Sequence, residues 1–166
     1  MILNATQKEV ENFLLTASTI SEDAKEYFKK KLLDGLDKKS KIIYISDKTN
    51  SDLLVAITNQ EDYDNSYRLI DNQTVYLVYI PHHEKNINEQ NFMDLLSYAE
   101  HDLKNKGVKN LTIGVDVSYV NDLKIILNLG FSEFVKYSFR PLKSQNNYKT
   151  NALVAYYKKI INLWYN

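Results

Sequence analysis

The residues best suited to chemistry form one short cluster, His82-His83-Glu84, directly after an apolar run. Histidine titrates near neutral pH, so either ring could accept a proton from an amine as a general base. The competing interpretation is a solvated histidine pair in a polar loop. A metal site would need a third ligand at the same place, but the third histidine, His101, lies well along a predicted helix. We therefore predict a base at His82 or His83 and no metal site.

A second group of titratable side chains lies in the polar stretch 59–71. Glu61 and Asp62 stand there with Asp64 and two tyrosines. Such an acidic, aromatic segment would attract a cationic substrate, and either carboxylate could take a proton from it. The alternative is an exposed polar loop without a function.

Composition excludes several classes of protein. The 166 residues suit one domain, so we treat 1–166 as a single unit. There is no cysteine, which excludes disulfides, thiol nucleophiles and cysteine-based metal sites. The 21 basic and 21 acidic residues cancel, and Arg68 and Arg140 are the only arginines, so we expect no nucleic-acid partner.

Membrane insertion and secretion are also not expected. The longest apolar run, Val75 to Pro81, is far shorter than the roughly 18 residues of a membrane span. Residues 1–13 lack the basic start and apolar centre of a signal peptide. We therefore expect a cytoplasmic protein with no membrane partner.

Hydrophobic periodicity predicts the elements that must position these groups. Apolar residues recur at helical spacing over 10–17, 24–36, 92–103 and 120–127. Strand-like runs occupy 42–46 and 53–58, joined as a hairpin by turn-forming residues, and then 75–80, 111–117 and 131–142. Over Asn151–Trp164 the spacing favours a helix, although alternation there also fits a strand. Because helices and strands do not alternate regularly, we predict an α+β fold with a mixed sheet.

Several motifs, taken together and in order, resemble the GNAT family of N-acetyltransferases. The opening MILNATQKEVE is similar to the start of that family, Tyr79-Ile80-Pro81 resembles the end of its fourth strand, and Leu129-Gly130-Phe131 resembles the L-G-F after its fourth helix. The resemblance implies a central mixed β-sheet of six or seven strands flanked by four helices, with 152–159 as the seventh strand. It also implies that the strand ending at Pro81 and the strand 111–117 are adjacent, parallel and separated at their C-terminal ends.

The same resemblance implies transfer of an acetyl group from acetyl-CoA to an amine on a small molecule or peptide, with a homo-oligomer compatible with the sequence. The backbone of Val78, Tyr79 and Ile80 would hold the acetyl end. His82, His83, Glu61 or Asp62 would be the base. The remaining expected cofactor contacts are Asn86, Ile87, Asn88, Gln90, Asn91 and Asn121.

Two departures from the family pattern are visible. The family binds the pyrophosphate with a glycine-rich loop, whose backbone can approach the phosphates closely, but Ile87 to Phe92 contains neither glycine nor arginine. Instead, Asn86 and Glu89 could form a capping box that places a carboxylate there. Ile126 occupies the position of the family's proton-donating tyrosine. We therefore expect weak acetyl-CoA binding, and a catalytically inactive binding or regulatory protein with this fold is the alternative.

Overall fold

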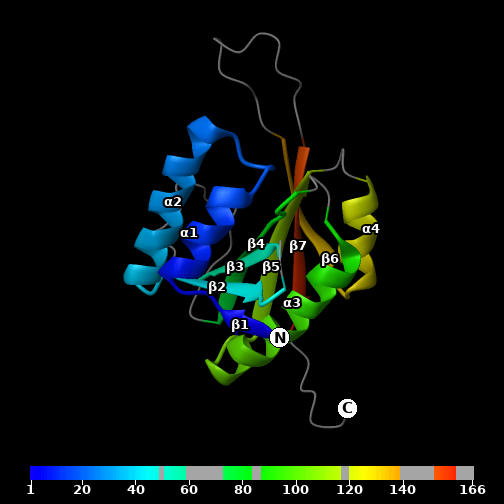
Figure 1. The fold of residues 1–166 in the computed structure, drawn as a ribbon. Coiled ribbons are helices and arrows are strands. Elements are labelled where there is room, and N and C mark those ends of the chain that lie inside the picture. Colours follow the sequence, from blue (N-terminus) through cyan, green and yellow to red (C-terminus); the bar gives the residue numbers. More distant parts are fainter. Residues whose placement is uncertain (49–50, 59–72, 84–86, 117–119, 139–151, 160–166) are drawn as a thin grey trace.

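A computed structural model describes residues 1–48, 51–58, 73–83, 87–116, 120–138 and 152–159 (Figure 1). The described strands are β1 (Ile2–Asn4), β2 (Lys41–Ser46), β3 (Leu53–Ile57), β4 (Thr74–Ile80), β5 (Asn110–Asp116), β6 (Ser132–Ser138) and β7 (Ala152–Lys159). The described helices are α1 (Gln7–Thr16), α2 (Glu22–Asp37), α3 (Glu89–Asn105) and α4 (Val120–Asn128). This confirms the predicted α+β fold with four helices, and the sheet has seven strands.

The strands form one mixed sheet in the order β1-β2-β3-β4-β5-β7-β6. Neighbours from β1 to β4 pair antiparallel, β4 and β5 pair parallel, and β7 lies antiparallel between β5 and β6. The parallel pair is possible because α3 forms the crossover between β4 and β5. The predicted hairpin of β2 and β3 is confirmed.

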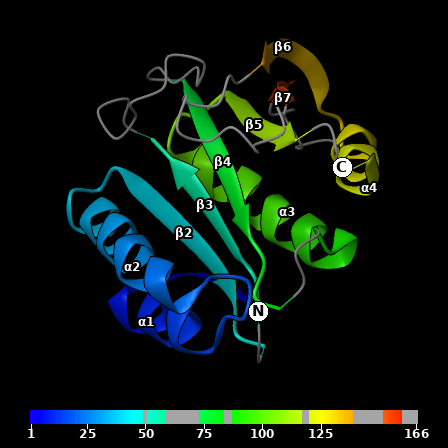
Figure 2. The ribbon, with the colours of Figure 1, turned by 90° about the horizontal axis from the view of Figure 1, so that it is seen from above.

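Helices cover both faces of the sheet (Figure 2). On one face α1 and α2 bury a core that includes Val10, Phe13 and Leu32 against Ile43 and Val55. On the other face α3 contributes its apolar stripe, which is Phe92, Leu95, Leu96, Ala99 and Leu103, and α4 adds Ile126. The central strands are therefore buried on both faces, as their continuous apolar sequences predict.

The helix boundaries follow local sequence signals. Thr6 caps α1, and its capping box with Glu9 is formed. Gly107 follows α3 with a φ of +86°, and Gly130 follows α4 with a φ of +96°. Both are left-handed conformations, in which glycine meets no penalty. No helix in the described part of the chain is long and apolar enough to cross a membrane.

The helix that periodicity favours over 151–164 is wrong for residues 152–159. Ala152–Lys159 is a strand, as the family resemblance implies, and it pairs with β5 on one side and β6 on the other. The residues that pair with β7 lie far away in the sequence, so local periodicity does not detect this strand. At its end, the Lys158 ammonium donates to the buried Glu100 carboxylate on α3.

Candidate functional site

The parallel strands β4 and β5 separate at their C-terminal ends. Their pairing runs from Thr74↔Asn110 to Leu77↔Ile113 and ends there. However, β4 continues to Ile80 and β5 to Asp116. The β5-facing edge of Val78–Ile80 therefore has no pairing with β5, and its backbone groups are available to a ligand. The predicted parallel, separating pair is confirmed.

The start of α3 lies beside this opening, and its cap differs from the prediction. Asn88, and not Asn86, is the N-cap, and its side-chain oxygen accepts from the Asn91 backbone N–H at 3.0 Å. Glu89 is therefore the first residue of the helix and does not close a capping box. Its carboxylate still stands in the first turn, where it interacts favourably with the helix dipole and competes with any bound anion.

A buried carboxylate from α4 holds the segment that precedes α3. Asp122 is 6% exposed, and its Oδ1 accepts from the Ile87 backbone N–H at 2.9 Å. Desolvation raises the pKa of Asp122, and the bond from Ile87 opposes that rise. One of the backbone N–H groups expected to face the pyrophosphate is therefore already bonded to an internal acceptor.

A second buried carboxylate, Asp52, organises the end of β4. It is 6% exposed and accepts three hydrogen bonds. Its Oδ1 accepts from the His82 backbone N–H at 2.7 Å, and its Oδ2 accepts from the Asn91 side-chain amide at 3.1 Å and from the Tyr79 hydroxyl. The three donors come from β4, from the residues after it and from α3, so Asp52 fixes these elements relative to one another.

Tyr79 belongs to this network and points towards α3. Its ring packs edge-on against Phe92, with centroids 5.4 Å apart. Burial, followed by the hydrogen bond to Asp52, raises the pKa of Tyr79 well above its usual range. The phenol therefore stays protonated at any physiological pH, and its proton is held by Asp52.

His82 is buried against α1, with 2% of its surface exposed. Its Nε2 lies 2.7 Å from the Thr16 hydroxyl, and that hydroxyl donates to the Asn12 carbonyl at 3.2 Å. We therefore assign the proton to Nε2, which donates to Thr16. The other nitrogen, Nδ1, is buried without a partner among the described residues. Desolvation, followed by the neighbouring His83, lowers the pKa of His82.

His83 is exposed, and its Nδ1 lies 3.1 Å from the Ser18 hydroxyl. The two histidine rings are in edge contact, with centroids 4.0 Å apart. The structure thus brings both predicted histidines to the end of β4 in different environments, one buried and one exposed. Glu61, Asp62 and Asn86 lie outside the described residues.

The remaining predicted contacts, Gln90 and Asn121, lie on the surface, whereas Ile126, at the position of the family's tyrosine, does not. Gln90 and Asn121 are exposed, and Gln90 donates from its side-chain amide to Asp94 at 2.8 Å. Ile126 is fully buried in the core, so it cannot exchange protons with a ligand. No group of three or more histidine, aspartate or glutamate side chains that could hold a metal ion occurs among the described residues.

Sequence reasoning missed the two carboxylates that position the site. In the sequence, Asp52 resembles one more turn-forming residue between β2 and β3, and Asp122 resembles an ordinary acidic residue in a helix's first turn. One available signal was that Asp52 directly precedes the wholly apolar run Leu53–Ile57. Because Asp52 is next to a strand that is buried throughout, its carboxylate is buried as well.

Comparison with known proteins was informative only at the level of structure. No protein-family model matches the sequence, and no curated protein is significantly similar to it. A ribosomal-protein-alanine N-acetyltransferase from Brucella melitensis matches with a TM-score of 0.69 at 12% identity, covering 96% of this chain and 99% of that one. An aminoglycoside 6′-acetyltransferase type Ii matches with a TM-score of 0.68 at 11% identity, covering 98% of both chains.

A third match is the Salmonella typhimurium protein yncA, solved with its cofactor acetyl-CoA. Its TM-score is 0.64 at 12% identity, covering 99% of this chain and 95% of that one. Such identities establish the fold and leave the acceptor open, since the first two names specify different acceptors. Together with the separation of β4 and β5, these matches show that the chain has the fold of the GNAT acetyltransferases.

Proposed function

We propose that this protein is a GNAT-type N-acyltransferase that moves an acetyl group from acetyl-CoA to an amine. The observation that carries the proposal is the separation of the parallel strands β4 and β5 beyond Leu77 and Ile113, beside the start of α3. It provides an unpaired strand edge for the acyl end of the donor. Structures with this fold are named acetyltransferases, and one contains acetyl-CoA.

In this reaction the lone pair of a neutral amine attacks the carbonyl carbon of the thioester. A C–N bond forms, the C–S bond breaks, the amine proton passes to a base, and coenzyme A leaves as a thiolate that is protonated by water. A backbone N–H of β4 near Tyr79 or Ile80 would stabilise the negative charge on the carbonyl oxygen. Holding the two reactants together would supply most of the acceleration.

We assign the base to the residues after β4, with His83 as the first candidate. Its ring is exposed, and when Nδ1–H donates to Ser18, the opposite nitrogen is able to accept a proton. His82 is less suited to direct proton transfer because its ring is buried and its Nε2 bonds to Thr16. Glu61 and Asp62 remain candidates on sequence grounds.

A second candidate function, a non-catalytic protein with this fold, is favoured by the other end of the proposed donor site. Asp122 bonds to the Ile87 N–H, and Glu89 places a further carboxylate in the first turn of α3. Both carboxylates would repel the pyrophosphate of coenzyme A. These residues do not fit the pyrophosphate well, although the strand edge suits the acetyl and pantetheine part.

The two candidates are separated by calorimetric titration with acetyl-CoA and with acetyl-pantetheine, which lacks the nucleotide. If the acyltransferase proposal is correct, both compounds bind, and their affinities differ by less than about tenfold, or about 1.4 kcal/mol. Thiol release is then measured over a panel of amines, with His83→Gln as the test variant and His101→Gln as its matched control.

Two further variants distinguish a weak site from an absent one. Glu89→Gly removes the carboxylate and frees the backbone, so it should tighten acetyl-CoA binding, and Glu89→Gln shows how much of that gain is charge alone. If neither compound binds to the wild type or to Glu89→Gly, and no amine supports turnover, the protein is the non-catalytic one.

A further inference from the structure

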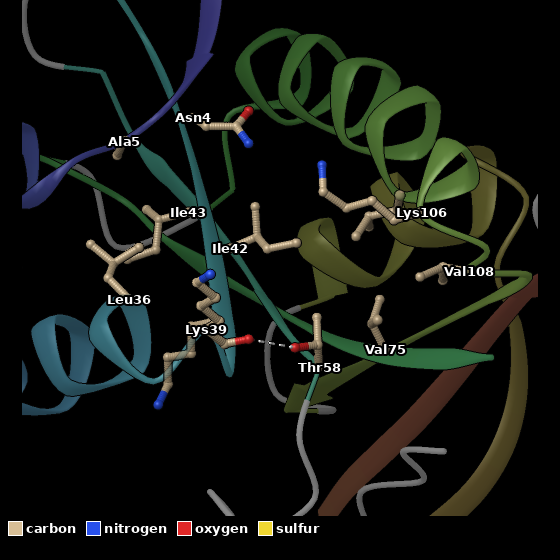
Figure 3. Close-up of a pocket in the computed structure, with 12 residues that line it drawn as sticks. Asn4, Ala5, Leu36, Lys39, Ile42, Ile43, Thr58, Val75, Lys106 and Val108 are labelled. Atoms are coloured by element: carbon tan, nitrogen blue, oxygen red, sulfur yellow. Dashed lines mark hydrogen bonds between the residues drawn. The ribbon is translucent and has the colours of Figure 1, made fainter. Parts of the chain in front are cut away.

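A cavity of about 510 Å³ lies near the start of β4, and Figure 3 shows residues that line it. Val75, at the start of β4, lines it, whereas Ile80 marks the far end of the same strand. Val75 and Ile80 are five positions apart along β4, which corresponds to about 17 Å. The volume falls within the range of small-molecule sites, about 300 to 1,000 Å³. The cavity is therefore distinct from the donor site.

The cavity exists because β1 is shorter than β2. The paired residues end at Asn4↔Tyr44, and the Ala5 backbone N–H still donates to the Ile43 carbonyl at 2.7 Å, so only Lys41 and Ile42 extend beyond this contact. Ile42 and Ile43 both line the cavity, although consecutive strand residues point to opposite faces. The cavity thus lies at the edge of β2, beside the C-terminal ends of α2 and α3.

The wall of the cavity is largely apolar. Leu36 from α2, Val75 from β4, and Leu103 and Val108 at the end of α3 line it together with Ile42. Of these, Val75, Leu103 and Val108 belong to the main hydrophobic core. A ligand that enters would therefore bury a hydrocarbon or aromatic body against the core.

The charged side chains of described residues that line the cavity are all cationic. Lys39, Lys41 and Lys106 line it with Asn4 and Thr58, and no carboxylate of a described residue does so. Lys106 is neutralised by Asp102, at 2.5 Å, and Lys41 donates to the Lys31 carbonyl at 3.4 Å. The ammonium group of Lys39 has no partner among the described residues, so it is the cation available to a ligand.

Lys39 occupies a position that normally favours glycine. It follows the cap of α2 with a φ of +58°, and the backbone N–H of Ser40 donates to the Gly35 carbonyl, which together form a Schellman ending. A lysine is disfavoured in this left-handed conformation, and glycine would suit the turn better. The side chain at this position therefore contributes nothing to the turn, while it places a cation at the cavity.

We propose that this cavity binds an amphiphilic anion, a carboxylate with a short apolar tail. The tail would lie against Ile42, Val75 and Leu103, and the carboxylate would pair with the Lys39 ammonium. The apolar wall indicates the tail, and the unpaired cation, with no lining carboxylate among the described residues, indicates a negatively charged head. The site is independent of acetyl transfer.

The probes are octanoate, octanol and octyltrimethylammonium, titrated below their micelle concentrations into the full-length protein with ¹H–¹⁵N NMR detection. We expect octanoate to shift the amides of Asn4, Thr58 and Val108 saturably, and octanol and the cation to bind at least tenfold more weakly. The amide of Ile80 should not move. Equal binding of all three probes, shifts confined to the Ile80 end, or no saturable shift would overturn the proposal.

Lys39→Gly is the decisive variant because it removes the cation while it relieves the strained turn. It should raise the melting temperature and weaken octanoate binding at least fivefold, with octanol binding unaffected.

Lys38→Glu and Lys39→Glu form a matched pair, since both reverse one charge but, of the two lysines, Lys39 alone lines the cavity. Octanoate affinity that falls equally in both would show a diffuse charge effect and contradict a built site. Acetyl-CoA titrations should be unchanged in Lys39→Gly, which separates this test from that of the acyltransferase.

Discussion

The two ends of β4 carry opposite chemistry. At its C-terminal end, two buried carboxylates, Asp52 and Asp122, accept hydrogen bonds from the strand end, from α3 and from the segment before α3. At its N-terminal end, the cavity is lined by lysines and apolar side chains, and the Lys39 ammonium is unpaired among the described residues. One end is therefore rich in acceptors that are already satisfied, whereas the other offers an unused donor.

This difference matters for a protein whose substrate would be a polyanion. Part of the negative charge of coenzyme A lies on its pyrophosphate, which the proposed function would place at the start of α3, beside Glu89 and the Asp122 carboxylate of α4. The formal net charge of zero does not reveal this difference in charge between the two ends of β4. If the protein binds acetyl-CoA as proposed, Glu89 and Asp122 would weaken that binding, while Asp122 also holds the Ile87 backbone.

The largest effect is expected at Asp52. Asp52→Ala would leave the Tyr79 hydroxyl, the His82 N–H and the Asn91 amide without their buried acceptor, so we expect a loss of about 3 kcal/mol in the free energy of unfolding. Chemical denaturation would measure it. Asp47→Ala removes an exposed carboxylate from the same connection, whose ion pair is with the Met1 ammonium, and should lower the free energy of unfolding much less. Equal losses would show that Asp52 does not organise this end.

The second-largest effect is expected at Asp122, where a substitution should change the affinity for acetyl-CoA. Asp122→Asn keeps an oxygen acceptor for the Ile87 N–H but removes the negative charge, so acetyl-CoA affinity should rise by up to about tenfold, or about 1.4 kcal/mol. Calorimetry would measure it against Asp94→Asn, an exposed aspartate one turn into α3. Unchanged affinity in Asp122→Asn would mean that the pyrophosphate does not approach this segment.

Much of the fold could be predicted from the sequence because its elements have strong local signals. The apolar stripe of 92–103, with Gly107 after it, predicts α3, and the turn-forming residues between two β-rich runs predict the hairpin of β2 and β3. The seventh strand could not be obtained from periodicity, since its ladders to β5 and β6 depend on distant residues. Only the family resemblance placed it correctly.

The sequence predicts a candidate site at the end of β4 from His82 and His83, and the structure places both histidines there, but their contacts were not predictable. A poor fit of the 87–92 segment for a pyrophosphate stays a prediction from its missing glycines. The roles of Asp52 and Asp122 were not predictable, because burial of a carboxylate depends on donors that come from three separate elements. The shift of the α3 cap from Asn86 to Asn88 has the same cause, since Asp122 fixes the Ile87 N–H just before the helix.

A smaller change in stability is expected at the turn that follows α3, near the N-terminal end of β4. Gly107 has a φ of +86° and open space around a substituted Cβ, so Gly107→Ala introduces backbone strain without a clash. We expect a loss of about 1 kcal/mol in the free energy of unfolding. Lys39→Gly makes the reverse change at the end of α2 and should gain a similar amount. If chemical denaturation shows the same sign for both changes, backbone strain in the left-handed turns does not control stability at these two positions.

The smallest effect is a pH dependence of stability that originates at His82. Its pKa is lowered in the folded protein, because the ring is buried and protonation would place a hydrogen on Nδ1, which has no acceptor among the described residues. As the pH falls below about 6.5, the ordinary histidine pKa, the unfolded chain takes up a proton at His82 that the folded protein does not bind. The free energy of unfolding should therefore fall as the pH falls from 7.5 to 5.5.

The slope of that fall cannot exceed about 1.4 kcal/mol per pH unit for one proton, and it should be well below that limit over most of the range. Denaturation at each pH would measure it in the wild type and in His82→Gln, whose amide can still donate to Thr16 but does not titrate. The slope should become shallower in His82→Gln and stay the same in His101→Gln, which changes an exposed histidine on α3. A wild-type slope retained in His82→Gln would mean that the pH dependence comes from another group, and that the buried ring is not the point at which protonation opposes folding.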